Sequence, residues 1–249
     1  MAIFISFEGG EGSGKSAQSQ ILGERLNNFG LQTLLIREPG STPLGKYLRE
    51  WMKRETSSKE TVSPVAELFV FAAARAEVVQ KVVKPALKLP GMVIITDRFA
   101  DSTTAYQGYG RKLPLDKIAR INEIAMQGVK PDLTFLLDCD PQVALDRIGN
   151  VQLTLPMKEN SDETVVSSNR VDQVGTRRFE QESIEFHKRI RSGYHQMVKV
   201  EPNRWHVVDG SMSIEDVSAS IWNALPKKLS GLDKSSFIMD ALSQTFNTA

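Results

Sequence analysis

A glycine-rich segment near the N-terminus carries residue types that bind phosphate. Residues 8–16 read Glu-Gly-Gly-Glu-Gly-Ser-Gly-Lys-Ser and match the spacing G-x-x-x-x-G-K-S/T. Glycines let the backbone turn tightly and point successive N–H groups at phosphate oxygens, while Lys15 adds a mobile positive charge and Ser16 a hydroxyl for magnesium. The spacing therefore predicts a nucleotide-phosphate site. Its residues are Gly9, Gly10, Glu11, Gly12, Ser13, Gly14, Lys15 and Ser16.

The segments on either side of this loop have the periodicity that such a site requires. The apolar run 3–7 predicts a strand, and the following segment predicts a helix with Ile21, Leu22, Leu26 and Phe29 on one face and Gly30 after its last turn. Because the motif lies between a strand and a helix, we favour a phosphate-binding loop over a glycine-rich turn with an ordinary surface lysine.

A second pair of charged residues follows a later strand. Asp97 and Arg98 come directly after the apolar run 92–96, and parallel sheets bind ligands at the carboxyl ends of their strands. Asp97 is therefore predicted to bind magnesium through the metal's water shell, together with Ser16. The alternative is that Asp97 only caps the end of the strand.

Five strand-like runs alternate with long segments of helical spacing. The runs cover residues 3–7, 33–36, 92–96, 133–137 and 205–208. This alternation predicts an α/β fold with a five-stranded parallel sheet and helices on both faces, the P-loop NTPase arrangement. Ser63 and Pro64 predict a helix start, with the helix running past Arg75 until Pro85 or Pro90 intervenes. Pro114 is predicted to open another helix.

Composition restricts the class of protein. The 249 residues are 41% hydrophobic, which suffices for one domain with a sizeable core, and the net charge of +1 predicts no nucleic-acid or membrane partner. Apolar stretches are too short and too charged to span a membrane. Cys139 is the only cysteine, and the N-terminus lacks a signal-peptide pattern, so we expect a cytoplasmic protein.

Two segments differ in composition from the rest. Residues 149–175 are polar and poorly periodic, and arginines at 170, 177 and 178 lead into a charged helix predicted over 179–199. This pattern is typical of a lid over a phosphate site, covering about 147–178, although a surface insertion is the alternative. We expect one domain over residues 1–226, followed by an appendage, 227–249, whose apolar residues have the spacing of a helix.

Several ordered motifs together resemble one enzyme family. Besides the glycine-rich loop they are Arg-Glu-Pro-Gly at 37–40, Phe-Ala-Ala-Ala-Arg at 71–75, Asp-Arg-Phe at 97–99 and Ser-Thr-Thr-Ala-Tyr-Gln-Gly at 102–108. In this combination the chain resembles thymidylate kinases, most closely the bacterial kind, from residue 1 to about 226. The resemblance implies magnesium-dependent transfer of the ATP γ-phosphoryl group to dTMP, giving dTDP and ADP on the route to dTTP, by a homodimer.

The resemblance also implies roles for individual residues. Lys15 and Ser16 would hold the phosphates of ATP and magnesium, and Asp97 would orient the metal's water shell. Arg49 and Arg98 match the positions that grip the acceptor monophosphate. No general base is needed when an ionised phosphate oxygen attacks, since positioning and charge neutralisation lower the barrier.

The nucleoside of the acceptor would contact a further set of residues. Phe71 would stack on thymine, and Arg75 would donate to a thymine carbonyl. Tyr106 would crowd a 2′-hydroxyl, and Glu11 would approach the 3′-hydroxyl. The remaining members of this set are Ser102 and Gln107 at the base edge, and Glu38 and Pro39 in the turn beside the acceptor or metal.

A mobile arginine is also expected, because one magnesium ion and Lys15 neutralise only part of the negative charge that develops in the transition state. Some family members carry a basic residue inside the phosphate loop, but this chain does not. The lid would then supply it. Arg147 and Arg178 align with basic positions at the lid's edges, whereas Arg170 and Arg177 have no firm counterpart. His187, His195 and His206 are too scattered for a metal cluster and are interpreted as surface or packing residues.

Two other functions stay open at this point. Another nucleoside monophosphate kinase would share the phosphate chemistry but differ in the residues that read the base. A nucleotide-dependent switch would bind ATP with little turnover, and the absence of an Asn-Lys-x-Asp motif disfavours it.

Overall fold

The computed structural model describes residues 2–53, 62–154 and 177–229 of the chain. One all-parallel sheet has the strand order β2-β3-β1-β4-β5. The strands are β1 (Ile3–Glu8), β2 (Gln32–Arg37), β3 (Met92–Asp97), β4 (Leu133–Asp138) and β5 (Trp205–Asp209). All five predicted strands are confirmed to within one residue at either end.

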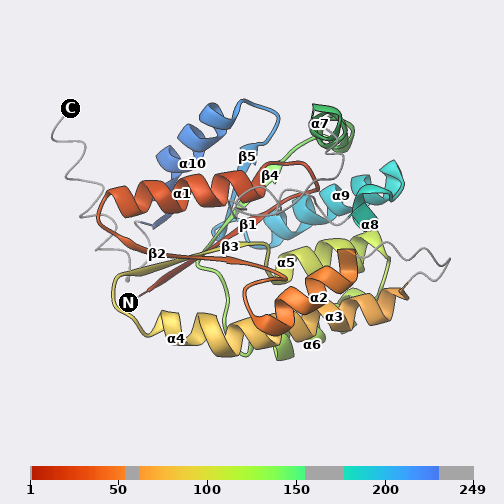
Figure 1. The fold of residues 1–249 in the computed structure, drawn as a ribbon, viewed down its shortest axis with the longest axis horizontal. Coiled ribbons are helices and arrows are strands. Elements are labelled where there is room, and N and C mark those ends of the chain that lie inside the picture. Colours follow the sequence, from red (N-terminus) through yellow and green to blue (C-terminus); the bar gives the residue numbers. More distant parts are fainter. Residues whose placement is uncertain (1, 54–61, 155–176, 230–249) are drawn as a thin grey trace, which may run out of the picture.

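Helices cover both faces of the sheet, as the alternating pattern predicted (Figure 1). On one side lie α1 (Lys15–Asn28) and α10 (Ile214–Leu229), and on the other lie α3 (Pro64–Val78), α4 (Lys84–Leu87) and α6 (Leu115–Met126). The remaining elements are α2 (Pro43–Lys53), α5 (Ala100–Thr103), α7 (Pro141–Thr154), α8 (Arg177–Glu180), α9 (Ile184–Val200) and two π-helical turns, η1 (Val79–Val83) and η2 (Thr104–Gly110).

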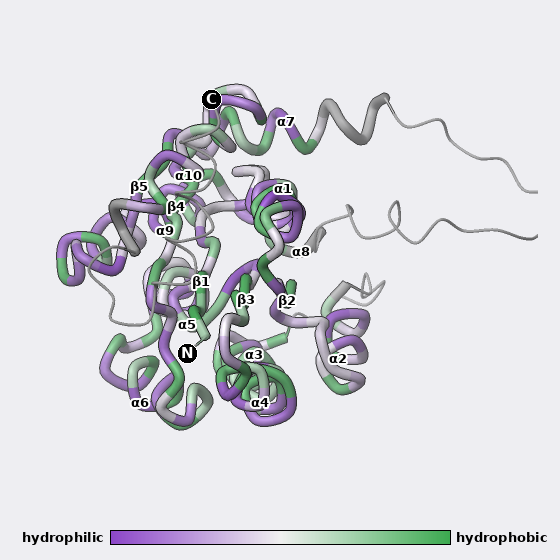
Figure 2. The backbone as a smooth tube through the Cα atoms, turned by 90° about the vertical axis from the view of Figure 1, so that its left-hand side faces the viewer, coloured by the Kyte–Doolittle hydropathy of each residue, from purple (hydrophilic) through white to green (hydrophobic). Residues whose placement is uncertain are grey.

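The central strand β1 is buried on both faces. Ile3, Ile5 and Phe7 belong to the core beneath α1 and α10, whereas Phe4 packs edge-on against Phe99 with ring centroids 5.0 Å apart. Figure 2 shows this apolar centre in green between the helices. Because alternate residues face opposite sides, the last residue of β1, Glu8, points its carboxylate to the same side as Phe4. It is fully buried there.

The helix boundaries follow local signals. Ser63 caps α3 by accepting from the N–H of Ala66, and Gly30 follows α1 with φ 79°. Pro114 is the N-cap of α6, which confirms the predicted start. After α3 the chain stays helical through η1 and α4 to Leu87, so it passes Pro85 and ends before Pro90.

The lid and tail predictions are revised where the structure describes them. The helix predicted over 179–199 is two helices, α8 and α9, because Ser183 accepts from the N–H of Phe186 and starts a new helix. Helix α7 covers the first part of the polar segment 149–175, and residues 155–176 lie outside the described residues. Helix α10 continues past Pro226 to Leu229, and the rest of the appendage is outside as well. Within the described ranges, we find no helix with the length and apolarity to cross a bilayer.

Candidate active site

The phosphate loop connects β1 to α1 and depends on its glycines for both conformation and space. Gly9, Gly12 and Gly14 have φ values of 145°, 70° and 91°, a region that favours glycine. A Cβ at Gly9 would lie 2.6 Å from the carbonyl oxygen of Leu137, and one at Gly12 would lie 2.1 Å from that of Ala144. The loop is therefore held closely between the end of β4 and helix α7.

Lys15 is positioned over this loop. Its Nζ donates to the carbonyl oxygen of Gly10 at 2.5 Å and to Ser13 Oγ at 3.2 Å, and the side chain is buried. Burial, together with repulsion from Arg98, lowers the pKa of Lys15 to about 8. A bound polyphosphate would offer this ammonium stronger acceptors than the loop carbonyl.

Ser16 and Asp97 are brought together as predicted. Ser16 Oγ donates to Asp97 Oδ2 at 2.5 Å, and Arg37 Nε lies 3.5 Å from the same oxygen. Among the described residues, none hydrogen-bonds to Asp97 Oδ1, although this oxygen is buried. A hydroxyl and a carboxylate with a free lone pair are ligands that suit magnesium and its waters, so the residues fit that ion.

Arg98 connects the phosphate loop to the second half of the site. It has φ 72°, and its guanidinium donates to Gly9 O at 3.0 Å, Ser102 Oγ at 3.1 Å, Glu11 Oε1 at 2.8 Å and Tyr106 Oη at 2.9 Å. Burial alone would raise the pKa of Glu11, but Arg98, Lys15 and the Tyr106 hydroxyl together hold that pKa below its usual value. Glu11 is therefore ionised at neutral pH.

Glu8 shapes this region but was not among the predicted site residues. Oε1 accepts from the N–H of Phe99 at 2.7 Å, and Oε2 accepts from Ser102 Oγ at 2.5 Å and Tyr194 Oη at 3.0 Å. These bonds fix the backbone at Phe99, directly after Arg98, which has the left-handed φ of 72°. Burial raises the pKa of Glu8 to about 7, with a further contribution from Asp101. The signal in the sequence was a carboxylate at the end of a strand that is apolar apart from Ser6.

Arg75 lies in a buried polar cluster. Its Nε donates to Glu38 Oε2 at 2.9 Å, and the other donors reach Asn122 Oδ1, Phe99 O and Thr103 Oγ1. A guanidinium has five N–H donors, so within the described residues these four bonds leave one hydrogen on NH1 unused. Burial raises the pKa of Glu38 to about 7 in spite of Arg75. Glu38 thus contacts Arg75 and, in the described chain, not the Ser16–Asp97 pair.

The aromatic residues of the predicted base site gather near the end of the lid. Phe71 stacks on Phe179 of α8 with centroids 6.1 Å apart, and Tyr106 meets Phe179 edge-on at 5.1 Å. Gln107 donates its amide N–H to Glu67 at 2.8 Å, and Ser102 donates to Glu8. Both polar side chains are buried in these networks, which limits what they can offer to a base.

The other predicted arginines lie in different places, and the structure describes only some of their side chains. Arg49 donates to the carbonyl oxygen of Pro39 at 3.1 Å, which places it at the turn after β2. Arg147 donates to the carbonyl oxygens of Gly210 at 2.6 Å and Ser211 at 2.5 Å, so it joins α7 to the loop between β5 and α10. The backbone of Arg178 belongs to α8, whereas Arg170 lies outside the described residues. Among the described side chains, no three metal-binding residues cluster.

The comparisons with known proteins agree with this geometry. A family model described as thymidylate kinase matches residues 7–165. The chain is 40% identical over 223 residues to a thymidylate kinase of Chlorobaculum parvum, covering 90% of this chain and 95% of that one. It is 42% identical over 221 residues to one of Dehalococcoides mccartyi, covering 89% and 94%.

A solved structure is similar as well. The crystal structure of thymidylate kinase from Ehrlichia chaffeensis superposes with a TM-score of 0.67 at 28% identity, covering 90% of this chain and 98% of that one. The fold, the phosphate loop and the relatives point to the same conclusion. The chain belongs to the thymidylate kinase family, and its reaction is phosphoryl transfer from ATP to dTMP.

Proposed function

We propose that this chain transfers the phosphoryl group in line between two sites that meet at Arg98. The observation that carries the proposal is the set of bonds from this one guanidinium to Gly9 and Glu11 of the phosphate loop and to Tyr106 of η2. Lys15 holds the β- and γ-phosphates of ATP, while Arg98 and Arg49 hold the acceptor phosphate. Fixing both reactants supplies much of the rate enhancement in phosphoryl transfer.

Ser16 and Asp97 are proposed to hold magnesium. The buried Asp97 Oδ1, which no described residue satisfies, supports this assignment. When bound, the ion would neutralise charge on the phosphate oxygens. Arg37, 3.5 Å from Asp97 Oδ2, helps to orient the carboxylate for this task.

The nucleoside of dTMP is proposed to bind between α3 and η2. Phe71 stacks on thymine, and the NH1 hydrogen left on Arg75 donates to a thymine carbonyl. Tyr106, fixed by its hydroxyl to Arg98 and Glu11, crowds a 2′-hydroxyl, and Glu11 accepts from the 3′-hydroxyl. Ser102 and Gln107 support the site through Glu8 and Glu67 rather than by donating to the base.

The lid is proposed to supply the mobile cation of the transition state. Arg147 donates two hydrogen bonds to the loop after β5. It is therefore better placed to organise ATP binding than to reach the transferred phosphoryl group. Arg178 and the neighbouring arginines 170 and 177 are then the candidates for the catalytic cation.

A homodimer is the proposed assembly. Helices α2 and α3 pack side by side (Figure 1). Both helices expose large apolar side chains to solvent. Tyr47 is 64% exposed and Phe69 57%, and the others on these helices are Leu44, Trp51 and Val65. Exposed apolar side chains concentrated in this way are typical of a surface that a second copy covers.

An ATP-dependent assay across a panel of nucleoside monophosphates tests the proposed site. We expect the highest kcat/KM with dTMP and a requirement for magnesium. Faster turnover of uridylate or guanylate would contradict the proposed base site. Tight ATP binding without phosphorylation of any acceptor would instead indicate a switch protein.

A further inference from the structure

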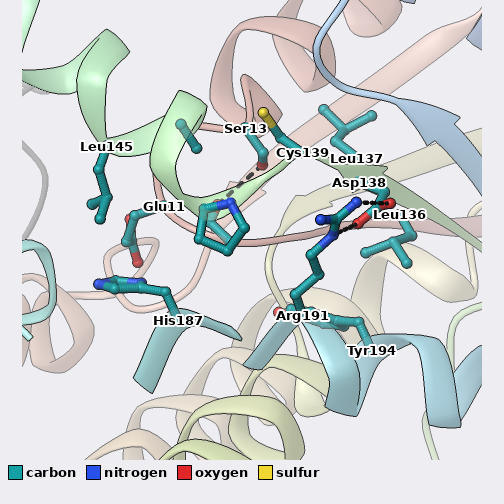
Figure 3. Close-up of a pocket in the computed structure, with 13 residues that line it drawn as sticks. Glu11, Ser13, Leu136, Leu137, Asp138, Cys139, Leu145, His187, Arg191 and Tyr194 are labelled. Carbon is teal, nitrogen blue, oxygen red and sulfur yellow. Dashed lines mark hydrogen bonds and ion pairs between the residues drawn. The ribbon is translucent and has the colours of Figure 1, made fainter. Parts of the chain in front are cut away.

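A small cavity lies beside the phosphate loop, between the end of β4 and the helices α7 and α9. It is lined by Gly10, Glu11 and Ser13, by the end of β4, by α7, and by His187, Arg191 and Tyr194 of α9. Figure 3 shows the imidazole of His187 next to the carboxylate of Glu11. The cavity volume of about 20 Å³ exceeds the roughly 10–15 Å³ that one water molecule needs.

Two groups on this cavity have hydrogen-bonding capacity that the described residues do not use. His187 is 4% exposed, and its Nε2 is buried without a hydrogen-bond partner in the described chain. Glu11 accepts from Arg98 and from Tyr106, and both bonds end on Oε1. Within the described residues, Oε2 accepts no hydrogen bond. Buried polar atoms in native proteins are nearly always satisfied, so His187 Nε2 requires a partner, while Glu11 Oε2 can accept a further hydrogen bond.

The protonation state of His187 follows from its surroundings. Burial lowers its pKa, and a hydrogen bond joins the ring to the backbone of Phe179. Since Nε2 is unbonded, this bond comes from Nδ1–H, which leaves Nε2 as an acceptor. Glu11 is ionised, so its Oε2 is an acceptor too. A single molecule that satisfies both must donate twice, and water does so.

We propose that His187 is a positioning residue for Glu11, acting through one water that donates to His187 Nε2 and to the Glu11 carboxylate. The proposal rests on the proposed role of Glu11 as acceptor for the 3′-hydroxyl of dTMP. Arg98 and Tyr106 hold one carboxylate oxygen from one side, and the water holds the carboxylate from the other. Without that second support the carboxylate can rotate about its last bond, and its geometry toward the sugar is lost.

The experiment compares dTMP with 3′-deoxythymidine monophosphate, which lacks the hydroxyl that Glu11 is proposed to bind. His187→Phe keeps the ring size and removes the acceptor, whereas His187→Gln retains a polar atom close to the position of Nε2. His195→Phe, on the same helix but away from Glu11, is the matched control. KM, kcat and the melting temperature are measured for each variant, with inhibition constants where 3′-deoxythymidine monophosphate turns over too slowly.

We expect His187→Phe to raise KM for dTMP by about five- to tenfold, the size of one weakened hydrogen bond, with little change in kcat. Binding of the 3′-deoxy compound should stay unchanged, and His187→Gln should restore most of the loss. A crystal structure of the wild type should show a water within hydrogen-bonding distance of both groups. Equal effects on both acceptors, or none on dTMP, would overturn the proposal.

The same measurements distinguish a failure of this inference from a failure of the proposed role of Glu11. If the wild type binds both acceptors equally well, the proposed role of Glu11 is wrong and the inference falls with it. If the wild type binds dTMP more tightly than the 3′-deoxy compound, and His187→Phe shows the same preference, only the inference about His187 is wrong.

Discussion

Arg75 and Glu38 form an ion pair that is almost completely buried: Nε and Oε2 are 2.9 Å apart, and the side chains are 2% and 5% exposed. The pair joins α3 to the turn after β2. The second carboxylate oxygen of Glu38 is buried without a partner among the described residues. A carboxylate that is only half satisfied in a buried site binds a proton readily, which agrees with its raised pKa of about 7.

This pair predicts how stability depends on pH. The pKa of Glu38 rises from 4.5 when unfolded to about 7 when folded, so the folded state binds the proton more tightly. The stability from this group is fully present below about pH 4.5 and is lost as the pH rises through 7. At 1.36 kcal/mol per pKa unit, the loss is about 3 kcal/mol.

Glu38→Gln mimics the protonated acid and should remove this pH dependence. We expect the variant and the wild type to have similar free energies of unfolding at pH 5, with the variant gaining relative to the wild type by pH 8. Urea denaturation at pH 5, 6.5 and 8 measures the difference. Parallel stability profiles would show that Glu38 does not titrate in this range.

Lys15→Ala should reduce kcat by about a hundredfold or more while leaving the fold intact, because the loop then lacks its cation for the transferred phosphates. Since the pKa of Lys15 is about 8 in the free enzyme, ATP affinity of the wild type should also fall as the pH rises past 8. Steady-state kinetics with circular dichroism tests the first point, and calorimetric titration with ATP at several pH values tests the second. Lys117→Ala, an exposed lysine of α6, serves as the control, and wild-type turnover by Lys15→Ala would refute the loop's role.

Alanine substitutions at the four lid arginines, 147, 170, 177 and 178, should give one dominant loss of kcat, of about a thousandfold. Because Arg147 binds Gly210 and Ser211, its substitution should mainly raise KM for ATP. Steady-state kinetics with varied ATP and dTMP separates these effects. Four neutral results would mean that the catalytic cation comes from elsewhere.

The apolar face of α2 and α3 predicts the assembly state. Tyr47→Glu combined with Phe69→Glu should convert a dimer into a monomer, because charged side chains cannot be buried there without partners. Light scattering after size exclusion measures the mass. Ile214→Glu, at a position that is 57% exposed on α10, is the matched control and should leave the dimer intact. A wild-type monomer would contradict the proposal.

Local patterns were sufficient for much of this structure. The strands, the phosphate loop and the Asp97-Arg98 pair were predictable because each depends on neighbours in sequence, and the parallel sheet then aligns the carboxyl ends of β1 and β3. The π-turns and the break at Ser183 were missed, since a cap inside a charged helical pattern is easily read as continuous helix.

Partners from distant segments were not predictable in this way. Asn122 and Thr103 complete the shell of Arg75, and Tyr194 completes that of Glu8 across 186 positions of the chain. No spacing rule connects such residues, because only the packing of α6, α5 and α9 on the sheet brings them together. The same holds for His187, interpreted from sequence as a surface or packing residue but found facing the phosphate loop.

The close contact between Gly12 and α7 restricts how this enzyme could evolve. A side chain at Gly12 would collide with the carbonyl of Ala144 in α7, and one at Gly9 with that of Leu137 in β4. Neither position can therefore acquire an arginine unless α7 or the sheet moves. Gly10 differs: its backbone needs no left-handed conformation, and nothing lies within 4 Å of an added Cβ. Of the three glycines at positions 9, 10 and 12, Gly10 is therefore the one where a basic side chain could be added without backbone strain or collision.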